Sequence, residues 1–208
     1  MPITRRRLFR TNPAPLFVLD GVFTPEECEA WAERAEQVGY TKAMIDAGYG
    51  KHEVDLEIRN NDRAIVIDEA MADDLFERIK THLPDPPAGV VHTRMNPYLR
   101  FLRYDPGQYF RQHKDGMFRD GTEFSVLTVQ LYLNDGFDGG DTVFFDPVED
   151  RYIYSIPMQG SVLIFDQSEW LHEGDALLTG QKLCVRTEVM CADVNGTQDD
   201  DEDMGEQC

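Results

Sequence analysis

The stretch from Tyr98 to Asp141, YLRFLRYDPGQYFRQHKDGMFRDGTEFSVLTVQLYLNDGFDGGD, decides the fold. Runs of apolar and β-branched residues alternate here with glycine, proline and aspartate, which predicts strands joined by turns. His113 and Asp115 lie near the middle. Side chains two residues apart on a strand point to the same face, so an imidazole and a carboxylate are presented together. This pair suits one metal ion, although a surface histidine beside a solvated aspartate is the alternative for so short a motif.

A second histidine strengthens the metal interpretation. His172 stands in the run Leu-His-Glu-Gly, directly after an apolar strand pattern. Two histidines and one carboxylate on β-strands form the facial triad of non-haem Fe(II) oxygenases, which leaves open positions on the metal. The sequence therefore predicts that His113, Asp115 and His172 are the catalytic metal ligands.

An ordered series of motifs covers roughly half of the chain, between residues 98 and 192. The motifs are RYDPGQYFRQHKDG, LTVQLYLND, GGDTVFF, GSVLIFD and LHEGDALLTGQKLCVRTEVM. This series resembles the Fe(II)/2-oxoglutarate-dependent dioxygenases of the prolyl 4-hydroxylase type. The resemblance implies Fe(II) on the three predicted ligands, 2-oxoglutarate as cosubstrate, O2 as oxidant, and ascorbate as a candidate further cofactor.

The resemblance also implies which residues hold 2-oxoglutarate. In the family a basic residue nine or ten positions after the distal histidine binds the far carboxylate, and Lys182 stands ten positions after His172 within a Gly-x-Lys motif. Tyr132 in the Tyr-Leu-Asn strand and Tyr104 at the start of the Tyr-x-x-Gly-Gln turn face the cosubstrate in relatives. Thr128, on the same polar strand face as Tyr132, is assigned to the cofactor with them.

The pattern predicts a mixed α/β (α+β) fold, with a double-stranded β-helix, or jelly roll, backed by N-terminal helices. About eight strands are expected, near residues 98–104, 109–114, 124–134, 142–145, 152–156, 161–166, 170–174 and 182–191. Strand 124–134 is the most informative, because leucine and valine occupy one face whereas the other carries Thr128, Gln130, Tyr132 and Asn134. In a barrel that polar face lines the active-site cavity.

Two helices are expected in the N-terminal half. The first begins after Thr24, which has capping-box spacing to Glu27, and Pro25 occupies the first helical position. Its buried stripe is expected to run from Trp31 to Val38. The second helix is expected to span about residues 68–83, where a cluster of prolines stops it.

Three regions follow from these patterns. Residues 1–97 are expected to form N-terminal strands, supporting helices and a lid segment packed on the core, and residues 98–194 the catalytic double-stranded β-helix. Residues 195–208 are expected to form a disordered tail, since they contain six acids and no base. The polar segment 40–63 and the loop Gly116–Glu123 are expected to form a mobile lid over the open side of the barrel.

Arginines are the candidate residues for substrate binding. Arg186 shares the inward face of the last strand with the predicted cosubstrate lysine and matches no cosubstrate ligand of the family. It is therefore assigned to an anionic part of the substrate, with an internal partner such as Glu188 or Asp141 as the alternative. Arg59 and Arg63 lie where related dioxygenases carry a polar segment near the pocket mouth, and a capped surface turn is the alternative for them.

Two positions depart from the pattern of enzymes that hydroxylate prolyl peptides. Leu183 follows the predicted lysine where an aromatic residue is usual, and Phe110 stands where tyrosine is frequent. Neither position is a predicted metal or cosubstrate ligand. The expected substrate is therefore a peptidyl residue, with proline as one candidate, or an amino acid-like small molecule.

Composition excludes several function classes. The formal net charge of −19 at pH 7 argues against nucleic-acid binding, which requires a basic surface. No apolar run approaches the ~18 residues of a membrane span, and the start lacks the apolar region of a signal peptide. The four cysteines are widely spaced, as is typical of reduced thiols in a cytosol. We therefore expect a cytoplasmic protein without membrane or nucleic-acid partners; the oligomeric state is left open.

The leading hypothesis is an Fe(II)- and 2-oxoglutarate-dependent dioxygenase that hydroxylates an unactivated C–H bond and releases succinate and CO2. The first alternative is a cupin-type metal-binding barrel with another activity, which predicts no role for Lys182. The second is a non-catalytic barrel used for binding. Loss of a ligand would favour that second alternative, whereas all three ligands are present in the sequence.

Overall fold

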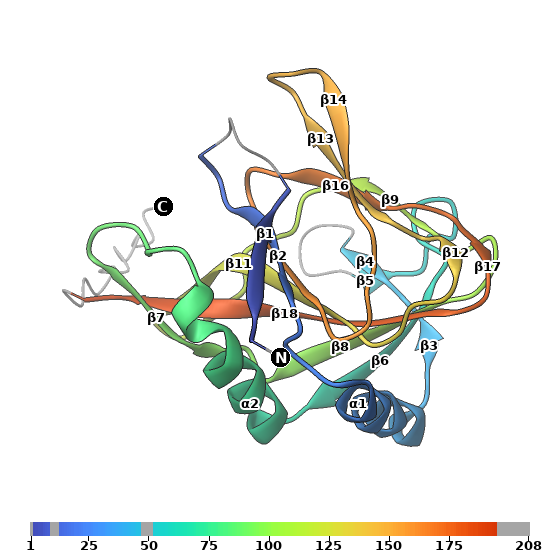
Figure 1. Ribbon diagram of the computed structural model, residues 1–208, viewed down its shortest axis with the longest axis horizontal. Coiled ribbons are helices and arrows are strands. Elements are labelled where there is room, and N and C mark those ends of the chain that lie inside the picture. The colour runs from blue at the N-terminus through green and yellow to red at the C-terminus, as the bar shows by residue number, and fades with distance from the viewer. Residues whose placement is uncertain (1, 9–12, 47–51, 195–208) are drawn as a thin grey trace, which may run out of the picture.

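The chain folds around two β-sheets that face each other, as a computed structural model of the protein shows (Figure 1). The structure describes residues 2–8, 13–46 and 52–194. Within them the larger sheet has ten strands, in the order β1-β2-β15-β11-β18-β8-β6-β3, with β10 paired to β11 and β7 paired to β18. The smaller sheet has four strands, in the order β14-β13-β16-β9. The predicted double-stranded β-helix is therefore confirmed.

The strands of the larger sheet are β1 (Thr4–Arg7), β2 (Leu16–Asp20), β3 (Thr41–Lys42), β6 (Asp62–Ile67), β7 (Val90–Met95), β8 (Tyr98–Tyr104), β10 (Arg119–Asp120), β11 (Glu123–Tyr132), β15 (Val162–Asp166) and β18 (Lys182–Asp193). Those of the smaller sheet are β9 (Phe110–His113), β13 (Thr142–Asp146), β14 (Arg151–Ser155) and β16 (Leu171–Gly174). Two short pairs are β4 (Ile45–Asp46) with β5 (His52–Glu53) and β12 (Asp138–Gly139) with β17 (Leu177–Thr179). The helices are α1 (Pro25–Val38), α2 (Glu69–Ile79) and the 3-10 helix η1 (Lys80–His82).

All eight strands predicted between residues 98 and 191 are present, and their ends differ from the prediction by at most two residues. The prediction missed β6 and β7, which extend the larger sheet from the N-terminal half. Strand β7 reads VVHTRM, with exposed or half-buried residues along most of its length. Its sequence therefore lacks the apolar periodicity that marked the core strands.

Strand β11 separates the hydrophobic core from the site. Its residues Leu127, Val129 and Leu131 belong to the main hydrophobic cluster, which also contains buried residues of both helices. The alternating residues Thr128 and Gln130 point to the opposite face of the sheet. That polar face lies inside the barrel, as predicted, since Gln130 lines an internal cavity.

The strand register brings further polar residues to the same face. Strand β18 pairs with β11 on one side and with β8 on the other. Arg186 of β18 is opposite Gln130 of β11 and Arg100 of β8, and Lys182 is opposite Tyr104 of β8. Residues directly opposite on neighbouring strands share a face, so these three strands form one polar floor.

Helices α1 and α2 cover the apolar face of the larger sheet (Figure 1). The predicted capping box of α1 is present, because Glu27 N donates to Thr24 Oγ1 at 3.3 Å and Thr24 N donates to the Glu27 carboxylate at 2.8 Å. The prediction that Val38 is buried was wrong. Its side chain is 49% exposed, because α1 ends at this residue and Gly39, with a φ of 87°, redirects the chain.

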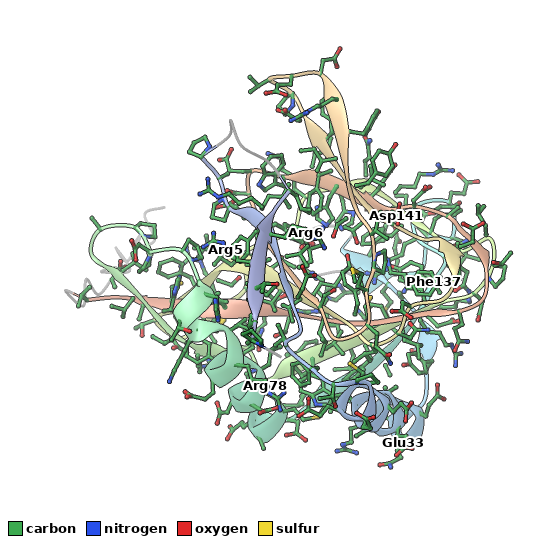
Figure 2. The ribbon with its side chains drawn as sticks, in the orientation of Figure 1. Arg5, Arg6, Glu33, Arg78, Phe137 and Asp141 are labelled. Carbon is green, nitrogen blue, oxygen red and sulfur yellow. The ribbon has the colours of Figure 1, made fainter. Side chains whose placement is uncertain are left out.

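Helix α2 is shorter than predicted, because its last turn tightens into the 3-10 helix η1. Arg78, labelled in Figure 2, lies near the end of α2 and contacts the start of α1. The guanidinium donates to the two carboxylate oxygens of Glu27 at 2.7 and 2.9 Å and to the carbonyl oxygen of Val22 at 3.1 Å. It also lies 4.2 Å from the ring centre of Phe23. This contact fixes the two helices on one side of the sheet.

Gly160 forms a tight junction between the segment before α1 and the start of β15. Its carbonyl oxygen accepts from the amides of Val22 and Phe23, each at 3.1 Å. Its φ is +75°, and a Cβ atom at this position would lie only 2.1 Å from the carbonyl oxygen of Phe23. Only glycine satisfies both the backbone conformation and the close approach.

The Gly160→Ala variant is therefore expected to be less stable than the wild type by about 2–5 kcal/mol, which combines the left-handed conformation with a backbone clash. Gly107→Ala is the matched control, since Gly107 has a φ of +84° and nothing within 4 Å of its would-be Cβ. It should lose only the ~1–2 kcal/mol of the left-handed conformation. Urea unfolding measures both, and equal losses would refute the role of the close contact.

Candidate metal centre

The two predicted histidine ligands lie opposite each other on the smaller sheet. His113 ends β9, His172 lies in β16, and the two residues are paired across these strands. Their ring centres are 4.3 Å apart. Asp115 follows β9 by two residues, and one donor atom from each of the three side chains lies within 4.8 Å of the others. The structure thus brings the predicted triad together.

Backbone carbonyls orient both imidazoles. His113 Nδ1 lies 2.8 Å from the carbonyl oxygen of Arg111, and His172 Nδ1 lies 3.1 Å from that of Trp170. Because a carbonyl oxygen only accepts, each Nδ1 carries a proton and donates, which makes Nε2 the nitrogen that can offer a lone pair in the neutral ring. The Nε2 atoms of His113 and His172 lie 3.6 and 3.8 Å from carboxylate oxygens of Asp115. Hydrogen bonds of this kind hold imidazoles in metal-binding orientation.

The carboxylate of Asp115 is held from two sides. Thr128 Oγ1 donates to Oδ2 at 2.6 Å, and Arg186 approaches through Nη2 to Oδ1 at 2.9 Å and through Nε to Oδ2 at 3.1 Å. Burial alone would raise the pKa of Asp115. The charge of Arg186 outweighs burial and keeps this pKa well below its ordinary value. The group is therefore ionised at neutral pH, as a metal ligand must be.

His172 is the more deeply buried of the two histidines. Its ring contacts Phe165 and Phe144, with ring centres 4.6 and 5.5 Å away. Burial lowers the pKa of His172 to about 4, although the neighbouring Asp115 acts in the opposite direction. The imidazole is therefore neutral at physiological pH, which is the form that binds a metal.

A small internal cavity of about 30 Å³ lies beside the histidines and contains Lys182. This residue is 2% exposed. Its Nζ donates to the carbonyl oxygen of Gly140 at 2.6 Å and lies 5.1 Å from the ring centre of Tyr104. Burial lowers the pKa of Lys182, and the nearby charge of Asp141 opposes that shift. Within the part of the chain that the structure describes, this ammonium forms no ion pair.

The other predicted cosubstrate residues take different positions. Tyr104 lines the small cavity. The hydroxyl of Tyr132 bonds to Thr142 Oγ1 at 2.9 Å, and Thr142 itself lines the cavity. Thr128 contacts Asp115 and thus supports a metal ligand. Lys182 and Tyr104 therefore line the cavity, whereas Tyr132 does not line it, although its ring centre lies 5.7 Å from Lys182 Nζ.

A larger cleft of about 440 Å³ opens in front of His113 and Asp115, and its lining includes all three predicted substrate arginines, Arg59, Arg63 and Arg186. Arg186 has Asp115 as its main partner, with Glu188 further away at 3.6 Å. Asp141, which the sequence suggested as a second possible partner, instead lies near Lys182, whose charge acts on its carboxyl.

Sequence reasoning missed Arg100 as a residue of this site and did not place Glu188 in it. Arg100 donates to the Glu188 carboxylate at 2.7 Å, and Asn96 Nδ2 donates to the same group at 2.9 Å. Strand periodicity could have placed Arg100 at the site, because Arg100 lies four residues before Tyr104 and therefore on the same strand face. The partnership with Glu188 depends on the register between β8 and β18, which no local pattern contains.

Parts of both predicted lid segments line the larger cleft. Met44, Ile58 and Arg59 come from segment 40–63, and Met117 and Phe118 come from the loop after Asp115. Their position agrees with a covering role, and their mobility stays a prediction. Residues 47–51 of the first segment and the predicted tail, residues 195–208, lie outside the described residues.

Comparison with known proteins supports the predicted resemblance. Residues 99–187 match the family model described as the 2OG-Fe(II) oxygenase superfamily. This segment includes the three metal-ligand candidates and Lys182. The resemblance to the prolyl 4-hydroxylase-like Fe(II)/2-oxoglutarate-dependent dioxygenases is therefore confirmed, together with the Fe(II), 2-oxoglutarate and O2 that the family implies. Ascorbate stays a prediction.

Two curated relatives carry related names. The chain is 28% identical over 133 residues to "Probable prolyl 4-hydroxylase 8" of Arabidopsis thaliana, an alignment that covers 62% of this chain and 44% of the relative. It is 28% identical over 99 residues to a PKHD-type hydroxylase of Crocosphaera subtropica, which covers 46% of this chain and 43% of the relative. The chain therefore aligns with less than half the length of either protein.

Solved structures share the fold. A prolyl-4-hydroxylase of Pseudomonas putida superimposes with a TM-score of 0.62 at 21% identity, covering 85% of this chain and 93% of the other. A prolyl hydroxylase of Trichoplax adhaerens, in complex with a peptide of hypoxia inducible factor, has a TM-score of 0.65 at 15% identity, covering 86% and 84%. At these identities the likeness establishes the fold alone.

The residues present fit Fe(II). Two imidazole nitrogens and one ionised carboxylate converge on one point, and this donor set on three residues is typical of non-haem Fe(II) sites. Hydrogen bonds to the carbonyls of Arg111 and Trp170 use Nδ1 of the two histidines, so each Nε2 is left facing Asp115. Separately, none of the helices in the described residues is long and apolar enough to cross a membrane.

Proposed function

We propose that the protein is an Fe(II)- and 2-oxoglutarate-dependent dioxygenase that hydroxylates an unactivated C–H bond of a peptidyl residue or an amino acid-like molecule. One observation carries the proposal. The convergent donors of His113, Asp115 and His172 lie beside a buried lysine, Lys182, that has no ion-pair partner among the described residues. A buried ammonium without a counter-charge is costly. The far carboxylate of 2-oxoglutarate would supply that charge.

The chain's own residues have distinct roles in this proposal. His113, Asp115 and His172 hold the metal, and Arg186 and Thr128 fix the direction of the Asp115 carboxylate. Lys182 binds the cosubstrate carboxylate with help from the Tyr104 hydroxyl. The small cavity that Lys182 lines, about 30 Å³ in volume, is the place that the cosubstrate carboxylate would enter.

When bound, Fe(II) supplies the redox chemistry that couples oxidative decarboxylation of 2-oxoglutarate to oxidation of the substrate. One O2 is consumed, with one oxygen atom passing to succinate and the other to the new hydroxyl group, while CO2 leaves. The protein positions the substrate C–H bond and keeps water away from the inner cavity. The burial of Lys182 and His172 supports such a dry inner compartment.

The cupin-type alternative predicts no role for Lys182. Against it stand the burial of this lysine, its place beside the metal donors and the match of residues 99–187 to the oxygenase family. Proline is one candidate for the residue hydroxylated, and the names of the relatives favour it. Leu183 and Phe110 depart from the prolyl hydroxylase pattern, and Phe110 stacks on His113 at 3.6 Å between ring centres.

The cellular setting belongs to the same proposal. The described cysteines, Cys28, Cys184 and Cys191, are all buried and free of disulfides. Burial raises the pKa of Cys28 to about 11, so its thiol is unreactive at neutral pH. These thiols support a reducing, cytoplasmic compartment.

A turnover assay tests the proposed reaction. The protein is incubated with Fe(II), 2-oxoglutarate and air, and succinate and O2 consumption are measured. We expect succinate to form in equal amount to the O2 consumed, and to disappear when iron is chelated or oxygen removed. Protein that binds iron and 2-oxoglutarate but consumes O2 without releasing succinate would contradict the proposal.

A further inference from the structure

The larger cleft beside the metal centre has a strongly cationic wall. Four arginines line it, namely Arg59, Arg63, Arg100 and Arg186. The whole chain carries a formal net charge of −19. The local charge of this cleft is therefore the reverse of the charge of the protein as a whole.

The acids in the cleft do not neutralise these arginines. Glu188 is fully engaged, because it accepts from Arg100 at 2.7 Å, contacts Arg186 at 3.6 Å and accepts from Asn96 at 2.9 Å. Asp115 is held by Arg186 and faces the two histidines as a metal ligand. The two acids thus form ion pairs with only two of the four arginines, Arg100 and Arg186.

Arg59 and Arg63 are the arginines left over. Among the described residues, neither forms an ion pair. Arg59 is 7% exposed, its Nε donates to Asn61 Oδ1 at 2.7 Å, and its guanidinium lies 4.3 Å from the ring centre of Phe110. Burial, with Arg186 and Arg63 nearby, lowers the pKa of Arg59 to about 10, although Tyr104 acts in the opposite direction. The group stays charged at neutral pH, so the cleft holds an unneutralised, pre-oriented cation.

Apolar side chains also line the cleft, together with His52 and Lys114. Met44, Ile58 and Met117 line it and are 40%, 40% and 53% exposed. A small anion on the arginines would leave these side chains in water. A polypeptide segment that placed one carboxylate on the arginines would cover them with its neighbouring residues, which is a favourable burial of apolar surface.

We infer that the prime substrate is a polypeptide that presents an aspartate or glutamate carboxylate to Arg59 and Arg63, at or next to the residue hydroxylated. The inference rests on the proposed function for the reaction itself. It adds the substrate class, which is an acidic peptide segment flanked by apolar residues. A carboxylate suits this site because the planar guanidinium groups form paired, charge-assisted hydrogen bonds with it.

Arg63 gives the clearest test. It lines the larger cleft, whereas Arg59 also lines the small cavity assigned to 2-oxoglutarate. A change at Arg63 therefore addresses the prime substrate separately from the cosubstrate. Arg34 on α1 is exposed and outside both cavities, so Arg34→Glu makes the same change in net charge and is the matched control.

The experiment uses the full-length protein loaded anaerobically with Mn(II) and 2-oxoglutarate. Three pools of random peptides, with Glu, Gln or Lys fixed at the centre, are bound and recovered for sequencing. We expect wild type and Arg34→Glu to retain the Glu pool at least tenfold better than the Gln or Lys pools, with apolar residues enriched beside the acid. Arg63→Glu is expected to lose this preference and to retain the Lys pool best.

Three results would overturn the inference. They are a wild-type preference for the Gln or Lys pool, an unchanged preference in Arg63→Glu, and competition by free N-acetylglutamate as strong as that by the peptides. The readout needs no turnover, so it is separate from the proposed reaction. Failure of Mn(II) and 2-oxoglutarate to bind would count against the proposed function, and the same peptide selection on metal-free protein would still decide the substrate class.

Discussion

The His172→Ala variant is expected to lose Fe(II) binding and all turnover above background. The substitution removes one of two imidazole nitrogens from a three-residue donor set. Loss of an outer hydrogen-bond partner of a metal ligand already lowers metal affinity about 10–100-fold, so loss of a ligand should exceed that range. The neutral state of His172, which burial favours by lowering its pKa to about 4, means that the wild-type site needs no deprotonation at this position at pH 7.

Metal binding should be measured directly, by titration of the metal-free protein with Mn(II) and by iron content after reconstitution. His92→Ala is the control, since His92 lies on β7 and outside both cavities of the site. Thermal unfolding of the metal-free variants checks that both remain folded. Wild-type iron content together with wild-type turnover in His172→Ala would overturn the assignment of the metal centre.

The second large effect is expected at the cosubstrate. Lys182→Ala should weaken 2-oxoglutarate affinity by roughly one to two orders of magnitude, because a charge-assisted bond contributes about 1.5–3 kcal/mol and ~1.4 kcal/mol corresponds to tenfold. The loss should be large because Lys182 is 2% exposed and water cannot easily replace it. Affinity is measured by competition binding on the Mn(II)-loaded protein and by the 2-oxoglutarate dependence of succinate release.

Lys80→Ala provides the control for this change, since Lys80 is exposed in η1 and pairs only with Glu77 among the described residues. Arg186→Ala tests the second cation of β18. It removes the partner of Asp115 and also changes the lining of the small cavity, so we expect weaker metal binding, impaired hydroxylation and a smaller loss of 2-oxoglutarate affinity than in Lys182→Ala. If Arg186→Ala raised the 2-oxoglutarate requirement and Lys182→Ala did not, the far carboxylate of 2-oxoglutarate would bind Arg186 and not Lys182, which would contradict the proposal.

The three candidate metal ligands could be predicted from the sequence because they stand in short local motifs. His113 and Asp115 are two residues apart at the end of a strand, and period-two geometry alone places them together. His172 follows an apolar strand, and the order of the intervening motifs carried the resemblance. Lys182 was likewise fixed by its spacing from His172, and the structure puts it in the cavity beside the histidines.

The contacts that the arginines make could not be predicted from the sequence. Arg186 was given Glu188 or Asp141 as internal partners, whereas its main partner is Asp115, more than seventy residues away. Asp115 follows β9 of the smaller sheet and Arg186 lies on β18 of the larger sheet, so their contact depends on how the two sheets pack together. Pairing between distant strands is set by the packing of the whole sheet and leaves no local pattern.

In the N-terminal half, a helix cap was predicted correctly but a strand of the larger sheet was not. The capping box of α1 was predicted because Thr24 and Glu27 interact within one turn. Strand β6, which pairs with β8 from Asp62–Arg103 to Ile67–Tyr98, was missed at the end of a polar segment. A contact within one helical turn can therefore be read from the sequence, whereas the partner of a strand in the sheet cannot.

A crystal structure of the protein grown anaerobically with Mn(II) and 2-oxoglutarate tests the central claim most directly. We expect one Mn(II) ion bound by Nε2 of His113, Nε2 of His172 and the Asp115 carboxylate, with the far carboxylate of 2-oxoglutarate on the Lys182 ammonium. The metal on other residues, or the cosubstrate carboxylate on Arg63 or Arg186 with Lys182 still bonded to Gly140, would contradict the account.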